Sequence, residues 1–142
     1  MKISVQREDF DVGYEVKALS KDPKIGAVAT FVGVVREVPM TLEHYAGMTE
    51  REITKIVEQA GSRWQVMDCT VIHRYGELKP SDQIVLVAVA SAHRGDAFAA
   101  CEFIMDYLKT RAPFWKKEST PEGERWVEAR ESDDTAANRW KG

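Results

Sequence analysis

One nearly continuous apolar run constrains the fold of this chain more than any other segment. It reads Gln83-Ile84-Val85-Leu86-Val87-Ala88-Val89-Ala90 and has a single polar side chain, at its start. A strand that is apolar at successive positions is typical of the interior of a sheet, because a half-exposed strand alternates between apolar and polar residues. We therefore expect residues 83–90 to form a central, buried strand.

Other strands are predicted on both sides of this run. The first clear one spans Ile25 to Arg36 and contains Gly33, which predicts a bulge or a close backbone approach. A short connection leads to a paired strand over 41–45, and another strand is expected over 67–75. Pro80-Ser81-Asp82 predicts the turn that leads into the buried strand.

Two helices are predicted from apolar spacing. Thr49 and Glu52 have the spacing of a capping box, and the apolar pattern that follows ends at Gly61. The second helix is expected to run from an N-cap at Asp96 to Arg111, because Pro113 prevents its continuation. Its inner stripe comprises Ala97, Cys101, Ile104, Met105 and Leu108.

The order of these elements favours an α+β fold, because the strands and helices lack a regular βαβ alternation. Residues 114–120 and 124–130 predict a C-terminal β-hairpin. The 142 residues contain no repeat or linker, which predicts one domain over 1–142. We expect the polar tail, 131–142, to be loosely ordered and flexible.

Composition excludes several classes of protein. The net charge of −3 argues against non-specific coating of nucleic acid. The N-terminus has no apolar signal core, and no apolar run approaches the roughly 18 residues of a membrane span, so we expect a cytoplasmic protein. Cys69 and Cys101 have no metal-ligand spacing and are interpreted as small core residues.

A cationic and aromatic segment spans the predicted end of the second helix. Residues 109–118, KTRAPFWKKE, contain four cations and two large aromatic side chains. Lys109 and Lys116 can face one pocket from two different elements, which indicates an anion site. Lys109 and Arg111 also suit the negative end of a helix dipole without any ligand, but that alternative does not explain Lys116 and Lys117.

His93 and Arg94 form a second candidate site, after the buried strand and before a helix N-terminus that favours anions. The alternative is that His93 caps the loop and Arg94 makes a surface ion pair. Arg36 ends the strand that contains Gly33 and could reach the same pocket as Lys109, or it could be an ordinary strand-end cation.

The remaining chemistry-bearing residues give weaker signals. His44 and His73 lie inside predicted strands and are interpreted as strand-face or core residues. A three-histidine zinc site is the alternative, but no ligand spacing supports it, so we predict no metal. The sequence has no hydrolase elbow and no phosphate-binding glycine motif, which leaves the lysines as the best catalytic candidates.

Several segments together resemble the large, catalytic subunit of molybdopterin synthase, the MoaE family. They cover most of residues 25–140, and the most specific part is Phe103 to Glu118 with Pro121 to Arg130. The other matching segments are ATFVGVVR (29–36), LEHYAGMT (42–49), VIHRYGEL (71–78) and SAHR (91–94).

The resemblance implies an α/β hammerhead fold with a mainly antiparallel sheet and packed helices, and a homodimer with a small ubiquitin-like sulfur-carrier subunit at each end. The carrier's C-terminal Gly-Gly tail, as a thiocarboxylate, would enter the pocket. Two sulfur transfers to cyclic pyranopterin monophosphate (precursor Z) would form the dithiolene of molybdopterin, with no cofactor. The protein would therefore be a sulfurtransferase.

The resemblance also implies roles for individual residues. The catalytic pair would be Lys109 and Lys116. The substrate-binding residues would be His93, Arg94, Arg36 and Arg130, and the residues that shape the pocket would be Phe31, Met105 and Glu118.

One departure from the family pattern affects Arg36. Relatives usually have a longer, glycine-containing loop after the matching arginine, whereas only Glu37 to Thr41 fill this gap here. If that loop folds over substrate, closure or affinity would differ. The alternative function is a non-catalytic, dimeric scaffold that binds an anion or the carrier's carboxylate.

Overall fold

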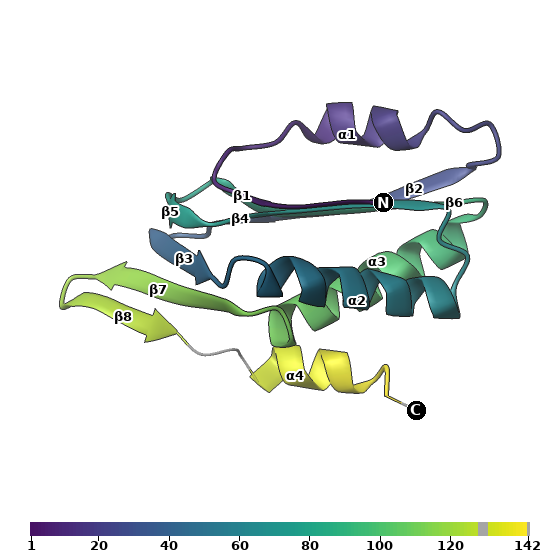
Figure 1. Ribbon diagram of the computed structural model, residues 1–142. Coiled ribbons are helices and arrows are strands. Elements are labelled where there is room, and N and C mark those ends of the chain that lie inside the picture. The colour runs from purple at the N-terminus through teal and green to yellow at the C-terminus, as the bar shows by residue number, and fades with distance from the viewer. Residues whose placement is uncertain (128–130, 142) are drawn as a thin grey trace.

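The computed structural model describes residues 1–127 and 131–141, and its strands form two four-stranded sheets (Figure 1). Adjacent strands are antiparallel except one pair, β1 (Lys2–Gln6) and β4 (Asp68–Arg74), which are parallel. The expected α+β class and mainly antiparallel pairing are confirmed. The first sheet has the order β1 (Lys2–Gln6), β4 (Asp68–Arg74), β6 (Gln83–Ser91), β2 (Ala27–Val34), and the second β5 (Gly76–Leu78), β3 (Met40–His44), β7 (Phe114–Thr120), β8 (Gly123–Val127).

Strand β6 is the predicted buried strand, and both of its faces are covered. Val85, Val87 and Val89 pack in one core cluster, while Leu86 and Ala88 pack in another on the opposite face. Successive side chains of a strand point to opposite faces, so an apolar run is required when helices cover both.

Helices cover this sheet on both sides (Figure 1). α1 (Val12–Leu19) lies on one face, and α2 (Met48–Arg63) and α3 (Arg94–Thr110) lie on the other. The predicted inner stripe of α3, from Ala97 to Leu108, is buried as expected. None of the helices in the described ranges is long and apolar enough to cross a membrane.

The predicted ends of α2 are wrong. Its N-cap is Gly47, whose N–H donates to the Glu50 carboxylate, and not Thr49 with Glu52. Thr49 is instead fully buried, and its hydroxyl donates to the carbonyl of Tyr45. The helix also continues past Gly61, whose missing side chain would contact nothing, to Arg63.

The predicted N-cap of α3 is also wrong. His93 is the N-cap, in an extended conformation, and Asp96 lies in the first helical turn. The Asp96 carboxylate accepts a hydrogen bond of 2.8 Å from the Gln65 N–H, beyond the end of α2. Asp96 thus joins two helices, which a capping pattern within one segment cannot reveal.

Both ends of the chain contain elements that the sequence did not predict. The N-terminal part contains β1 and α1, which begins after an Asp11 side chain that accepts from the Tyr14 N–H. The tail expected to be loosely ordered contains α4 (Glu131–Asn138). After it, the Trp140 indole N–H donates to Asp106 of α3, and Arg139 pairs with Glu102 and Asp106.

Gly26 provides a test of the packing between β2 and the end of β6. A Cβ at this position would lie 2.3 Å from the backbone oxygen of Ala92. We expect Gly26→Ala to lower the free energy of unfolding by about 1–3 kcal/mol, measured by urea denaturation, because backbone must move. Gly61→Ala is the matched control and should raise it by about 0.5–1 kcal/mol, since this helical site is open. Equal effects of the two substitutions would contradict the packing described here.

Candidate functional site

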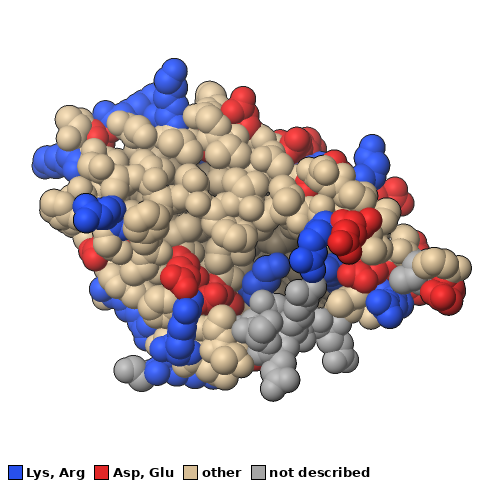
Figure 2. Space-filling model, turned by 180° about the vertical axis from the view of Figure 1, so that it is seen from behind, with Lys and Arg blue, Asp and Glu red and all other residues tan. Residues whose placement is uncertain are grey.

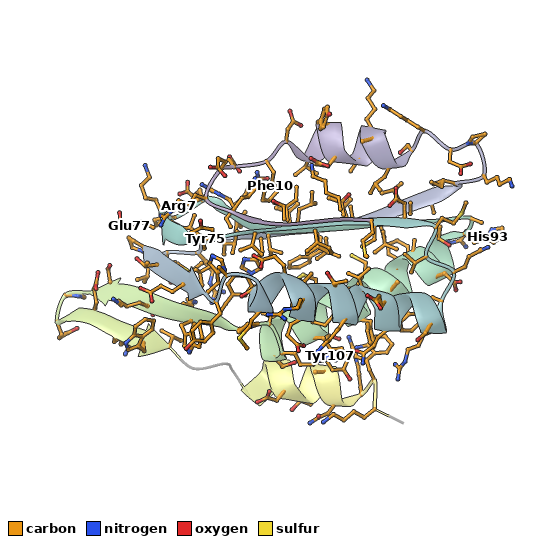
Figure 3. The ribbon with its side chains drawn as sticks, in the orientation of Figure 1. Arg7, Phe10, Tyr75, Glu77, His93 and Tyr107 are labelled. Carbon is orange, nitrogen blue, oxygen red and sulfur yellow. The ribbon has the colours of Figure 1, made fainter. Side chains whose placement is uncertain are left out.

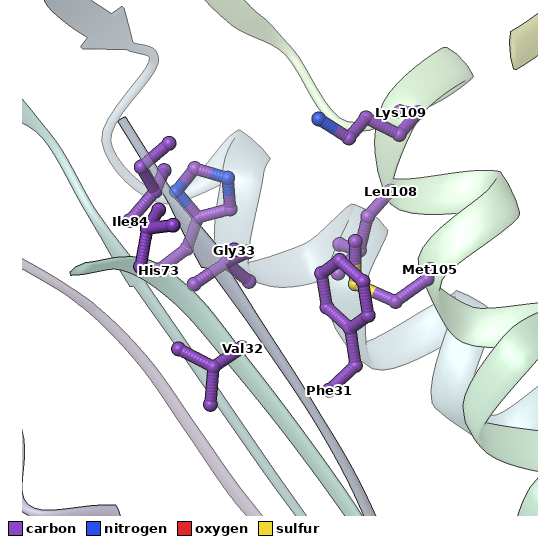
Figure 4. Close-up of a pocket in the computed structure, with 10 residues that line it drawn as sticks. Phe31, Val32, Gly33, His73, Ile84, Met105, Leu108 and Lys109 are labelled. Carbon is purple, nitrogen blue, oxygen red and sulfur yellow. The ribbon is translucent and has the colours of Figure 1, made fainter. Parts of the chain in front are cut away.

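A cavity of about 290 Å³ lies between the first sheet and the C-terminal end of α3 (Figure 4). It is close to the lower limit of the roughly 300–1,000 Å³ typical of small-molecule sites. Three residues expected from the sequence, Phe31, Met105 and Lys109, line it. The other lining residues are Val32, Gly33, Val34, His73, Ile84, Val85 and Leu108.

The floor of the cavity depends on Gly33. The register of β2 against β6 shifts between Gly33 and Val34, as the predicted bulge requires. A Cβ on Gly33 would lie 2.9 Å from a methyl carbon of Val85 and 3.4 Å from the Phe31 ring. A larger side chain there would therefore press on two residues that line the cavity.

Lys109 reaches the cavity from the last turn of α3. Its neighbours Met105 and Leu108 are buried, while Lys109 itself is exposed. The helix ends at Arg111, whose N–H donates to the Tyr107 carbonyl. The prediction that Pro113 ends the helix and starts an extended segment is confirmed by β7. The amine of Lys109 is thus held at the solvent side of a mostly apolar cavity (Figure 4).

His73 also lines the cavity, and sequence reasoning gave it no functional role. Its Nδ1 lies 2.9 Å from the Arg74 carbonyl oxygen, so this nitrogen carries the proton and Nε2 keeps its lone pair. Burial is the main cause that lowers the pKa of His73 to about 4. The hydrogen bond with the Arg74 carbonyl opposes this shift, and the positive charges of Lys109 and His44 contribute to it. At neutral pH the ring is therefore uncharged.

Lys116 and Glu118 lie on one face of β7. Alternate residues of a strand share a face, so both follow Phe114, whose ring stacks on His73 at 3.7 Å. Lys116 forms an ion pair of 3.2 Å with Glu118, and Glu118 also pairs with Arg125. Phe114, Lys116 and Glu118 are not among the residues that line the cavity, so this face of β7 meets the cavity lining through the contact of Phe114 with His73.

Arg36 lies two residues beyond Val34, a residue that lines the cavity. It belongs to the short connection between β2 and β3, where Glu37 adopts a positive φ of 68°. The connection is fixed from both sides. Val35 exchanges backbone hydrogen bonds with the 79–82 turn, and Pro39 accepts one from Ser119 of β7. Arg36 is exposed at the same end of the molecule as the cavity.

His93 and Arg94 lie at the opposite end of α3 from Lys109. Fifteen residues separate Arg94 from Lys109, which corresponds to about 22 Å along a helix. His93 is likewise far from His73, because β6 pairs with β4 through Val85 opposite His73 and then continues to Ser91. One chain therefore does not bring His93 and Arg94 to the cavity, nor the three histidines together. Figure 3 shows His93 at the end of the molecule opposite to Tyr75, which follows β4.

The last predicted site residue, Arg130, lies outside the described residues. Within residues 1–127 and 131–141, no group of three or more His, Cys, Asp or Glu side chains could hold a metal ion. Both cysteines are buried, and burial raises the pKa of Cys69 to about 12 and that of Cys101 to about 11. These thiols are therefore protonated and unreactive at neutral pH.

Charged side chains are unevenly distributed over the surface. Figure 2 shows the face opposite to that of Figure 1, where Lys and Arg side chains gather at the edge of a hollow. The same face has a broad area without charged side chains. Two large apolar residues of the edge strand β2 are exposed, Phe31 by 41% and Val34 by 54%.

Comparisons with known proteins agree on one family. The family model described as "MoaE protein" matches residues 5–111. The chain is 59% identical to a protein of Ralstonia nicotianae and 57% identical to one of Escherichia coli, both named "Molybdopterin synthase catalytic subunit". These alignments cover 97% and 98% of this chain and 83% and 97% of the relatives. A solved MoaE protein from Burkholderia ambifaria has 59% identity and a TM-score of 0.87, over 99% of both chains.

The neutral His73 predicts a pH dependence of stability. A histidine in the unfolded chain has a pKa of about 6.5, whereas His73 in the folded protein has a pKa of about 4. The contribution of neutral His73 to the free energy of unfolding is therefore fully present above pH 6.5. It is lost as the pH falls toward 4, which lowers this free energy by up to roughly 3 kcal/mol. Urea denaturation of the wild type and His73→Phe at several pH values should show a steeper acid loss in the wild type. Parallel losses in the two proteins would contradict this prediction.

Proposed function

Because the chain belongs to the MoaE protein family, we propose that it is the catalytic subunit of a molybdopterin synthase. It transfers two sulfur atoms from the C-terminal thiocarboxylate of a small ubiquitin-like carrier subunit to cyclic pyranopterin monophosphate, and so forms the dithiolene of molybdopterin. The observation that carries this proposal is the position of Lys109 at the cavity. It is supported by the relatives named molybdopterin synthase catalytic subunit, whose alignments cover nearly the full length of this chain.

The cavity suits the end of a carrier tail. Its lining is mostly apolar and narrow, which favours a chain end without side chains, and Lys109 supplies a cation for the thiocarboxylate. Each transfer replaces a carbon–oxygen bond of the pterin by a carbon–sulfur bond, and the oxygen leaves as water or as an oxygen of the ring-opened phosphate. Water then cleaves the acyl–sulfur bond and leaves the carrier as a carboxylate. Sulfur balance therefore requires two carriers for each product. Lys109 stabilises the negative charge that develops on the acyl oxygen.

The phosphate-bearing substrate binds beside the carrier tail in this proposal. Lys116 assists the substrate or intermediate, and its ion pair with Glu118 fixes the position of the ammonium on β7. Arg36, at the end of the molecule where the cavity lies, and Arg130 bind the phosphate. Phe31 and Met105 shape the pocket.

His93 and Arg94 serve the site of a neighbouring copy in a homodimer. This assignment follows from their separation from Lys109 along α3, which one chain cannot close. The exposed apolar residues of edge strand β2 and the uncharged area in Figure 2 suit such a self-association. We further propose that residues 1–142 act as a single domain and that the reaction takes place in the cytoplasm.

The catalytic lysines can be tested by reconstitution. Wild-type chain mixed with thiocarboxylated carrier should convert cyclic pyranopterin monophosphate to molybdopterin, with two carriers consumed per product. Lys109→Ala and Lys116→Ala should each lower kcat by about 100-fold or more, because charge stabilisation is lost. Lys117→Ala is the matched control and should retain activity, since Lys117 pairs with Glu124 and Trp126 on the other face of β7. Carrier binding without any product would favour the scaffold alternative.

The shared site can be tested by mixing inactive variants. Lys109→Ala and Arg94→Ala homodimers should each be nearly inactive. After subunit exchange, a mixed dimer has one site that lacks both groups and one that has both, so activity should return to about half per mixed dimer. If mixtures stay inactive although exchange is shown by mass spectrometry of labelled chains, Arg94 does not act in the neighbour's site.

A further inference from the structure

The His73 imidazole is fixed in one orientation at the wall of the cavity. Its ring stacks on Phe114, with centroids 3.7 Å apart and planes 19° apart, and Nδ1 donates to the Arg74 carbonyl. Two restraints of different kinds, one on the ring plane and one on a ring nitrogen, leave no second rotamer that satisfies both. The remaining nitrogen, Nε2, has a lone pair and no hydrogen.

Nε2 faces the cavity on the side of Lys109. Figure 4 shows the Lys109 amine extended toward the His73 ring from the opposite wall. Among the described residues that line the cavity, His73 and Lys109 are the two with polar side chains. The positive charge of Lys109 acts directly on His73, which places the two groups within electrostatic reach.

We propose that His73 is a positioning residue for Lys109, whose ammonium group donates a hydrogen bond to His73 Nε2 before substrate binds and keeps it during the reaction. This inference rests on the proposed function and adds a residue to it. The lysine side chain is flexible and loses rotamer freedom when its ammonium group is fixed in one position. Because His73 is itself fixed by two restraints, its hydrogen bond can orient Lys109 before substrate binds. The neutral ring also adds no charge that would compete with the carrier's thiocarboxylate.

The charged surroundings of His73 are consistent with this role. On β4 the adjacent Arg74 directs its guanidinium away, to the carbonyls of Arg7 and Gln83. On β3, His44 lies beyond Phe114, at 6.3 Å between ring centroids. On α3, Lys109 is the cation that lines the cavity. Among the described residues that line the cavity, His73 therefore provides the uncharged side-chain acceptor that faces the ammonium.

A spectroscopic test is independent of turnover. In protein labelled with ¹⁵N-histidine, His73 at pH 7 should show a protonated Nδ1 and an unprotonated Nε2. Lys109→Met should move the Nε2 resonance toward the position of an imidazole nitrogen without a hydrogen bond, and leave Nδ1 unchanged. Lys117→Met, on the far face of β7, should move neither. A proton on Nε2, or an Nε2 resonance that ignores Lys109→Met, would overturn the proposal.

A kinetic cycle tests the same link in the assembled enzyme. His73→Phe keeps a ring on Phe114 but removes Nε2, so kcat should fall about tenfold or more while carrier affinity stays within about twofold. His73→Gln, whose amide oxygen can replace Nε2, should restore part of this loss. In a Lys109→Ala background His73→Phe should cost nothing further, because His73 acts through Lys109. Losses that multiply, or full activity of His73→Phe, would refute the inference.

His44→Phe is the matched control for both experiments. His44 neighbours the same Phe114 ring but does not line the cavity, and its Nδ1 is buried without a partner among the described residues. Its replacement should leave kcat and the His73 resonances near wild type. If the wild type is inactive but the Nε2 resonance responds to Lys109→Met as expected, only the proposed function is refuted. If activity depends on Lys109 and Lys116 as expected but the Nε2 resonance does not respond to Lys109→Met, only the role of His73 is refuted.

Discussion

The two-sided burial of β6 is the constraint on which the rest of the structure depends. Its valines face α2 and α3, and the residues between them face α1. Because α3 begins directly after β6, the strand also fixes where that helix starts. The helix then returns along the sheet and places Lys109 beside Val85, near the beginning of the same strand. The length of α3, and not a loop, therefore sets the distance between Lys109 at its end and Arg94 at its start.

Local patterns predicted the elements whose signals lie within one segment. The apolar run of β6, the inner stripe of α3, its end before Pro113 and the irregularity at Gly33 are all confirmed. Patterns failed where a tertiary contact took the place of a local one. Thr49 is buried and bonded to Tyr45, and Asp96 accepts from a residue after another helix, so neither caps its own helix. The contacts of the C-terminal tail with α3 could not be predicted either, because they join residues that are far apart in the sequence.

The site divides in a similar way. The family resemblance is confirmed, and the dense cations and aromatics around the end of α3 indicated Lys109 from the sequence. His73 gave no such signal, because a histidine in a strand is usually a packing residue, and its function depends on which wall of which cavity it forms. The resemblance also implied that His93 and Arg94 bind the substrate on which Lys109 acts, without deciding which protomer supplies them. The length of α3 shows that a single chain keeps them apart, which only the three-dimensional arrangement makes plain.

The anchoring of the C-terminal segment has a consequence for the hairpin that holds Lys116. The chain leaves α3 at Arg111, forms β7 and β8, and comes back to α3 through Arg139 and Trp140. The hairpin is thus a loop closed at both ends on one helix. Closing a loop removes much of its conformational entropy in advance. Arg139 and Trp140 therefore restrict the motion of Lys116 indirectly, because they fix the C-terminal end of the segment that contains its hairpin.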